Sequence, residues 1–286
     1  MVTYSPMRVI LNLVLLLGVA LSAFGQSDLQ KLVDTEHLFA QVAAESGTKR
    51  AFLEFLADDA VVFVPDRVNG KEYWTDQQPS PSLLSWAPNY ADISSSGILG
   101  YTTGNWEFRP KGKDDTPAAF GEFITVWLRR PNGKYRFVVD IGVNHAKPAK
   151  YSTEWTTSSK TVKDRNEKNT SPADVSNGFL QTAGQSGMAT AYSLFGADEI
   201  RMYREEKLPI IGKKAVLASL RGNKAIVAFA KRSTFFGSGD ITYNLGTYTM
   251  SSGSKVIEKG NSMQIWKLIR GKWQIVLDIL KPVPVK

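Results

Sequence analysis

The stretch that decides the fold is SGTKRAFLEFLADD at residues 46–59, because it recurs as SGMATAYSLFGADE at residues 186–199, 140 positions later. A second block repeats in the same order, since GYTTG at 100–104 is echoed by TYNLG at 242–246. Matching blocks at nearly constant spacing indicate two homologous units in one chain.

A third pair of blocks closes each unit. Trp127, followed by GKYRFVVD, returns as Trp266, followed by GKWQIVLD. The stretch between the units is rich in Ser, Thr, Lys and Asn and has little apolar periodicity, which is typical of a linker. We therefore divide the chain into a first domain at 26–146, a linker at 147–172 and a second domain at 173–286.

Residues 1–25 have the pattern of a signal peptide. Arg8 precedes an apolar run over residues 9–21, and Ala23 and Gly25 are small residues at the two positions that a signal peptidase recognises. The run is shorter than the about 20 apolar residues of a membrane-spanning helix. We expect cleavage before Gln26, an exported mature protein that is periplasmic or secreted, and no membrane span in its mature form.

Composition excludes several classes of site. The chain has no cysteine, which rules out disulfides, thiolate nucleophiles and thiolate metal sites. The formal net charge is +8, but Lys and Arg are scattered among acidic residues, so no nucleic-acid partner is expected. Metal-ligand spacings and phosphate-binding glycine loops are missing from the sequence, so we expect neither a metal nor a cofactor.

Each unit has helices first and long strands afterwards. In the first unit, apolar spacing predicts helices over residues 29–42 and 48–56, with the break at Gly47, and strands near 60–64, 90–95, 98–108, 120–130 and 135–144. In the second, a helix begins after Ser171-Pro172, and a short helix at 213–220 precedes strands near 225–235, 241–248, 262–269 and 273–280. This order predicts an α+β fold in which helices cover one face of an antiparallel sheet.

The last strand of each unit predicts which side chains face the helices. Apolar residues alternate at 135, 137, 139 and 141, and again at 273, 275, 277 and 279. On this alternation Asp140 and Asp278 point to the opposite, outer face, where we expect a structural or interface role.

FLADDAVVF at 55–63, GKEYW at 70–74 and the block closing on Asp140 resemble the nuclear transport factor 2-like (NTF2-like) superfamily. Ketosteroid isomerase and the SnoaL-like polyketide cyclases belong to it. The resemblance covers both units and implies two tandem cone-shaped, cystatin-like domains. In each, a curved antiparallel sheet would wrap around helices and leave an apolar pocket at the wide end.

Ketosteroid isomerase tests the resemblance, because its reaction needs a carboxylate base and acidic hydroxyls for the oxyanion. On the shared ADDA motif, the base position of that enzyme falls on Val64 and the first oxyanion Tyr on Ala40. In the second unit the base position is Arg204. The resemblance therefore does not imply this isomerase activity, and we expect binding more than catalysis.

Aromatic residues are concentrated in the first unit, some of them near the proline-rich loop expected at 79–88. A pocket lined by aromatic rings with a few polar groups is how small apolar ligands are held, although aromatic rings are equally common in cores. We expect the core for Trp74 and the pocket rim for Trp86 and Tyr101. The candidate ligand-binding residues are Tyr73, Trp86, Tyr101, Trp106, Glu122 and His145.

Two functional hypotheses remain open, beside the simpler one that the second unit is purely structural and serves as a docking surface for a partner. The first is an exported protein that binds a small apolar or aromatic ligand in the first domain. The alternative is an enzyme of the cyclase, dehydratase or isomerase type that uses Glu122, His145 or a Tyr of the first domain. A carboxylate with a strongly raised pKa inside the pocket would favour it. As for partners, we expect an intramolecular pseudo-dimer of the two units, and a homo-oligomer is left open.

Overall fold

The computed structural model describes residues 27–284, apart from 153, 159–169, 224 and 231–233. The leader predicted at residues 1–25, with its cleavage site, and part of the predicted linker therefore lie outside the described residues. In the part that is described, no helix is long and apolar enough to cross a membrane.

The first domain begins with two helices that meet at a sharp corner. Ser27 caps α1 by accepting a hydrogen bond from the amide of Gln30 at 3.1 Å. Gly47 has a φ of 91° and separates α1 from α2, which confirms the predicted break. In chain order the elements are α1 (Asp28–Ser46), α2 (Thr48–Phe55), β1 (Leu56–Phe63), β2 (Arg67–Asn69), α3 (Gly70–Asp76), β3 (Leu83–Ile93), β4 (Leu99–Arg109), β5 (Ala119–Arg129) and β6 (Tyr135–His145).

The second domain repeats this plan. Its long helix kinks at Gly187, where φ is 82°, the repeat partner of Gly47. Ser171 caps this helix and Pro172 is its first residue, as predicted. The elements are α4 (Pro172–Phe195), β7 (Gly196–Arg204), β8 (Ile210–Ile211), α5 (Lys213–Ser219), β9 (Ile226–Phe229), β10 (Thr234–Ser238), β11 (Ile241–Ser252), β12 (Lys255–Ile269) and β13 (Lys272–Pro282).

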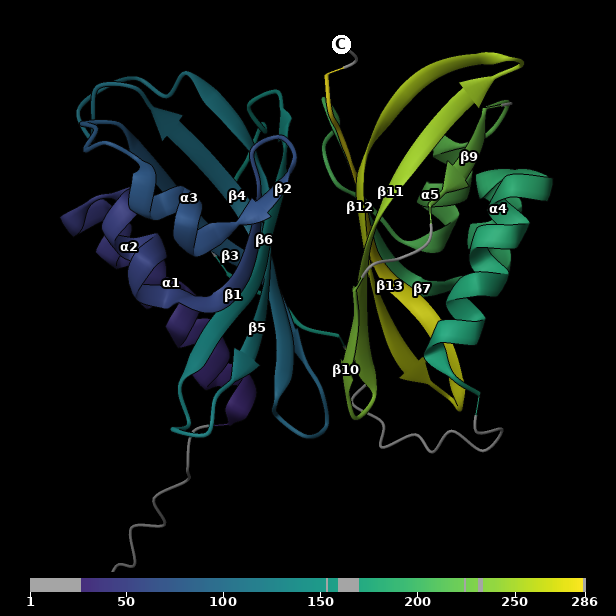
Figure 1. The fold of residues 1–286 in the computed structure, drawn as a ribbon, viewed down its shortest axis with the longest axis horizontal. Coiled ribbons are helices and arrows are strands. Elements are labelled where there is room, and N and C mark those ends of the chain that lie inside the picture. The colour runs from purple at the N-terminus through teal and green to yellow at the C-terminus, as the bar shows by residue number, and fades with distance from the viewer. Residues whose placement is uncertain (1–26, 153, 159–169, 224, 231–233, 285–286) are drawn as a thin grey trace, which may run out of the picture.

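The two sheets have the same strand order, in agreement with the repeat in the sequence. The first sheet runs β2-β1-β6-β5-β4-β3 and the second β8-β7-β13-β12-β11-β10, with β9 also paired to β11. In both, the strand after the helices pairs in parallel with the last strand, and the other pairs are antiparallel. Each sheet is covered by its own helices on one face (Figure 1). The chain is an α+β protein of two tandem cone-shaped domains.

A β-bulge in each last strand overturns the predicted facing of Asp140 and Asp278. In β6 the pairing passes from Val126–Val139 to Trp127–Phe137, which leaves Val138 as an extra residue. In β13 the extra residue is Val276. Because each bulge reverses the alternation, both aspartates face the helices of their own domain, and the prediction that they face outward was wrong.

Two strand boundaries also differ from the predictions. The proline-rich segment is not a loop throughout, because β3 starts at Leu83 and contains Trp86 and Pro88. A sheet edge tolerates proline, and β3 is the last strand of its sheet. The strand predicted at 225–235 is two strands, β9 and β10.

The outer faces of the two sheets pack against each other, with the helices on the far sides (Figure 1). One continuous hydrophobic cluster joins residues of both sheets; it includes Ile124, Val126 and Ile141 of the first domain and Tyr243, Met263 and Leu277 of the second. A separate cluster fills the second domain between its helices and its sheet. The contact between the domains is therefore an apolar layer.

Polar contacts at this interface fix how the sheets meet. Lys267 of β12 donates to both carboxylate oxygens of Asp92 at 2.8 and 2.7 Å, and both side chains are almost fully buried. The hydroxyl of Tyr203 donates to Thr103 at 3.1 Å. The carboxylate of Asp240 accepts from the amide of Ser95 at 2.7 Å. Such buried polar contacts favour one arrangement of the two domains.

Candidate functional site

A cavity of about 190 Å³ lies inside the first domain, between the helices and the sheet. We call it the inner cavity. It is smaller than the ~300 Å³ at which pockets for drug-sized ligands begin, so it suits a small molecule. Helices α1 and α2 contribute Phe39 and Phe52, and the sheet contributes Leu84, Trp86, Trp106, Phe123, Asp140, Gly142 and Asn144; Lys281 comes from the second domain.

Asp140 is the carboxylate of the inner cavity. It faces the helices because of the bulge at Val138, and one oxygen accepts a hydrogen bond from the hydroxyl of Thr125 at 2.8 Å. Burial raises the pKa of Asp140 to about 6, although Thr125 and the charge of Lys281 pull it back. A carboxyl group of this kind changes its protonation state close to neutral pH.

Lys281 brings a cation from the second domain to the inner cavity. The pairing of β1 with β6 ends at Val62 and Asp140, and just beyond that point the ammonium group of Lys281 donates to the carbonyl of Gly142 at 2.7 Å. Burial lowers the pKa of Lys281, while Glu205 and Asp140 oppose this effect. The cavity wall is therefore completed by both domains.

Glu36 of α1 is a second buried acid, close to the cavity. Its carboxylate accepts hydrogen bonds from Trp86 at 2.6 Å, Thr102 at 2.6 Å and Trp127 at 3.2 Å, and it is fully buried. Burial raises its pKa to about 7 against these three donors, and the charge of Asp140 adds to the rise. Glu36 thus fixes the indole of Trp86, which lines the cavity.

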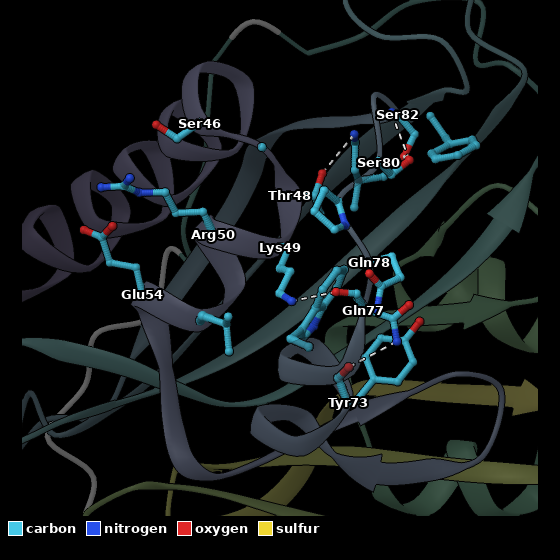
Figure 2. Close-up of a pocket in the computed structure, with 16 residues that line it drawn as sticks. Ser46, Thr48, Lys49, Arg50, Glu54, Tyr73, Gln77, Gln78, Ser80 and Ser82 are labelled. Carbon is cyan, nitrogen blue, oxygen red and sulfur yellow. Dashed lines mark hydrogen bonds between the residues drawn. The ribbon is translucent and has the colours of Figure 1, made fainter.

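A wider groove of about 860 Å³ lies outside the inner cavity, between α2, α3 and the segment that leads into β3 (Figure 2). We call it the outer groove. Leu84 lines both spaces. Trp74 lines the groove and stacks on Phe52 of the inner cavity, with ring centroids 4.3 Å apart. This stacked pair and Leu84 form the partition between the groove and the cavity.

The groove has its own polar wall. Lys49 donates to the carbonyl oxygens of Thr75 and Gln77 at 2.7 and 2.6 Å and so fastens the end of α3 to α2. The side chain of Gln77 donates to the carbonyl of Tyr73 at 3.1 Å (Figure 2). The indole N–H of Trp74 is buried and has no hydrogen-bond partner among the described residues.

The six predicted site residues do not form one site. Trp86 and Trp106 line the inner cavity, and Tyr73 lines the outer groove. Glu122 lines a different cavity, between the two domains. Tyr101 is fully buried in the contact layer between the sheets, so its placement at a pocket rim was wrong. His145 is buried at the end of β6, where Nδ1 lies 2.7 Å from the carbonyl oxygen of Ala146.

The second domain fills the corresponding space with an ion pair. Asp278, the counterpart of Asp140, is fully buried and accepts from Arg204 at 2.7 Å and from Gln264 at 2.6 Å. Arg204 also donates to the hydroxyl of Tyr192 at 2.7 Å. The hollow that remains beside Arg204 measures about 30 Å³. Of the two matched aspartates, Asp140 is the one that faces a cavity able to hold a small molecule.

No family model matches the chain, and no curated protein matches it. Among solved structures, it is similar to an NTF2-like protein of unknown function from Pseudomonas putida, with 15% identity, 40% of this chain and 84% of that chain covered, and a TM-score of 0.34. It is also similar to a protein of unknown function with a cystatin-like fold from Nostoc punctiforme, with 12% identity, 39% and 87% covered, and a TM-score of 0.33. It is similar as well to a conserved protein from Planctomyces limnophilus, with 21% identity, 42% of this chain and 100% of that chain covered, and a TM-score of 0.34.

Each of these matches covers about two fifths of this chain. The fold itself is given by the strand order of the two sheets and by the helices on one face of each. Both units have this architecture.

Sequence reasoning missed three groups at the inner cavity: Glu36, Asp140 as a cavity residue, and Lys281. Glu36 could have been found, because it continues the apolar stripe of Leu32, Val33 and Phe39 on the buried face of α1. A carboxylate on such a stripe must be protonated or hydrogen-bonded. No sequence pattern marks Lys281 as a cavity residue, because it reaches the cavity only through the packing of the second domain against the first.

Proposed function

We propose that the first domain binds a small molecule with an aromatic or apolar body in the inner cavity, its polar end at Asp140 and Lys281. The observation that carries the proposal is a carboxylate and an amine lining a cavity whose other walls are mainly aromatic. Apolar walls with a few placed polar groups are the usual construction of a small-ligand site.

The polar pair favours a hydroxyl group on the ligand. A hydroxyl can donate to the carboxylate of Asp140 and accept from an ammonium group, so it suits both neighbours at once. The aromatic side chains match a ring by shape and by edge contacts, as Phe39 and Trp86 already do at a centroid distance of 4.7 Å. Benzyl alcohol and phenol are therefore suitable probes, and toluene is the probe without a polar group.

The test is the melting temperature of the purified protein with each probe, because a ligand that binds the folded state stabilises it by mass action. We expect the two hydroxylated probes to raise it more than toluene does. In Asp140→Asn the rise should shrink, whereas Asp34→Asn, which removes an exposed carboxylate from α1, should respond like the wild type. An unchanged melting temperature with all three probes, or equal rises in both variants, contradicts the proposal.

A second candidate function is proton transfer in the same cavity, in line with the cyclase, dehydratase or isomerase alternative. It is favoured by the pKa of Asp140, about 6, because a general base works best when its pKa lies near the operating pH. Lys281 would stabilise the oxyanion that forms when a carbonyl compound loses its α-proton.

This candidate predicts that the protein accelerates exchange of the α-protons of phenylacetone in heavy water, followed by NMR. The exchange rate should rise with pH through about 6, as Asp140 becomes ionised, and Asp140→Asn should abolish the acceleration. Binding of the hydroxylated probes without any acceleration of exchange would leave ligand binding as the function and refute catalysis.

We also propose that the protein is exported after removal of residues 1–25. The support is the charge, apolar run and small residues of that segment. Expression of the full chain in a bacterium, followed by mass spectrometry, should give a mature N-terminus at Gln26 in the extracytoplasmic fraction; an intact N-terminus in the cytoplasm contradicts it.

A further inference from the structure

A second cavity, of about 360 Å³, lies between the two domains. We call it the interdomain cavity. Its walls come from the outer face of the first sheet, from β7 and the segment after it in the second domain, and from the chain that follows β6. Neither the inner cavity nor the outer groove shares a lining residue with it.

Glu122 of β5 provides a buried carboxyl group in this cavity. It faces away from its own helices, opposite in sense to its neighbour Phe123, which lines the inner cavity. Its side chain is 2% exposed, and Oε1 accepts from the amide of Asn105 at 2.5 Å. Oε2 is buried and makes no hydrogen bond of good geometry among the described residues, although the side chain of Asn89 lies close enough to favour the ionised form. A buried polar atom of this kind requires a partner, and a bound ligand would supply it.

Glu122 can be either neutral or ionised near neutral pH. Burial raises its pKa to about 8, while the positive charge of Arg201 and the side chain of Asn89 lower it. A group that satisfies Oε2 must therefore suit both the neutral and the ionised form. A hydroxyl does so, because it can accept a hydrogen bond from the first and donate one to the second.

Arg201 and Lys150 give the cavity an excess of positive charge. The guanidinium of Arg201 stacks on the ring of Tyr90 at 3.7 Å from its centroid, which fixes its position. Lys150 is exposed at the cavity rim. Two cations against one carboxyl group favour an anionic ligand, and a planar guanidinium matches a carboxylate best.

The cavity is built by fixed elements. The backbone of Thr156 exchanges two hydrogen bonds of 3.0 Å with the edge strand β3, through Ala91 and Asn89. The hydroxyl of Tyr203, which also lines the cavity, is tied to Thr103 across the interface at 3.1 Å. The segment after β6 thus closes the cavity as an added edge of the first sheet.

We propose that the interdomain cavity binds a small hydroxycarboxylic acid, its carboxylate on Arg201 and a hydroxyl on Oε2 of Glu122. The ligand spans both domains, because Glu122 belongs to the first sheet and Arg201 to β7 of the second. This site is independent of the ligand proposed for the inner cavity.

Isothermal titration calorimetry of the whole protein tests the proposal, with lactate and glucuronate as hydroxy acids. Propionate has the carboxylate without the hydroxyl, and glucose has hydroxyls without the carboxylate. We expect both hydroxy acids to bind, propionate to bind about tenfold more weakly than lactate because one hydrogen bond to a charged or buried group is lost, and glucose to give no saturable heat. The absence of saturable heat from both hydroxy acids overturns the proposal.

Three variants assign the binding to the cavity. Arg201→Gln should weaken both hydroxy acids more than about tenfold, and Glu122→Leu should abolish the preference for lactate over propionate. Asp140→Asn, in the inner cavity, should bind lactate like the wild type. If Arg201→Gln does not fold, as judged by circular dichroism, Lys150→Met at the exposed rim replaces it and should weaken both acids. Unchanged lactate binding in the folded Arg201 or Lys150 variant, or a lasting preference in Glu122→Leu, refutes the proposed contacts.

Discussion

Glu36 shows what a single buried carboxyl group does to stability. Its pKa is about 7 in the folded protein and 4.5 ordinarily, so the folded state holds its proton more tightly than the unfolded chain does. The stabilisation is complete below about pH 4.5 and is lost as the pH rises to about 7, because the ionised form then has to be buried. The loss amounts to about 3 kcal/mol.

Glu36→Gln should remove this pH dependence. The side-chain oxygen of a glutamine can still accept a hydrogen bond from the indole of Trp86, and its NH2 group can donate one to the hydroxyl of Thr102. The same hydroxyl also accepts from the indole of Trp127. Between about pH 4 and pH 8 the wild type should lose about 3 kcal/mol more of its free energy of unfolding than Glu36→Gln does. Urea denaturation at the two pH values measures both losses. Glu45→Gln, an exposed position on the same helix, is the control. If the free energy of unfolding depends on pH equally in all three proteins, Glu36 is not the group responsible.

At the scale of the strands, Gly121 of β5 is packed so closely against β6 and the ring of Trp106 that there is no room for a side chain at this position. A Cβ at Gly121 would overlap the carbonyl oxygen of Val143 and the ring of Trp106. We expect Gly121→Ala to lower the free energy of unfolding by ~1–3 kcal/mol, and to weaken ligand binding in the inner cavity by moving Trp106.

Gly184→Ala is the matched helix substitution. This exposed residue of α4 has no atom within 4 Å of the position of a Cβ, so the change should raise the free energy of unfolding by up to ~1 kcal/mol through helix propensity. Urea denaturation measures both variants. Destabilisation by Gly184→Ala, or a neutral Gly121→Ala, would show that the packing described for these elements is wrong.

The order of most helices and long strands could be predicted from the sequence, because it depends on local signals, but the structure has more elements than were predicted. The break at Gly47 and the alternation of long strands are both readable within one segment. The bulges were not predictable in this way. Residues 137, 138 and 139 are all apolar, so no polar residue marks the extra position, and the extra residue exists only relative to the neighbouring strand. The facing of Asp140, and with it the inner cavity, depended on that one residue.

At the scale of the whole molecule, the buried pair of Lys267 and Asp92 holds the two domains in one arrangement. Lys267→Met should destabilise the protein by ~3–5 kcal/mol, because it leaves a carboxylate buried without its partner. The double variant Lys267→Met with Asp92→Leu should recover most of the loss, as replacement of a buried ion pair by apolar residues usually costs little. Thermal denaturation compares the three proteins. A double variant no more stable than Lys267→Met contradicts a role as a pair.

We propose that the two domains pair with each other in place of a homodimer. The support is the apolar layer between the outer faces of the two sheets, which is already covered within one chain. Light scattering should then give the mass of a single chain at micromolar concentration. A stable dimer mass would show that another surface is used for assembly.

Lys281 has a consequence for how the two copies differ. In a symmetric dimer of identical subunits, any substitution is present in both subunits. A subunit that places a lysine in its partner's cavity therefore also has the partner's lysine in its own. Covalent fusion removes this symmetry. In the second domain Arg204 and Asp278 fill the interior, while Lys281 of the same domain lines the cavity of the first. Two identical chains related by symmetry could not differ in this way.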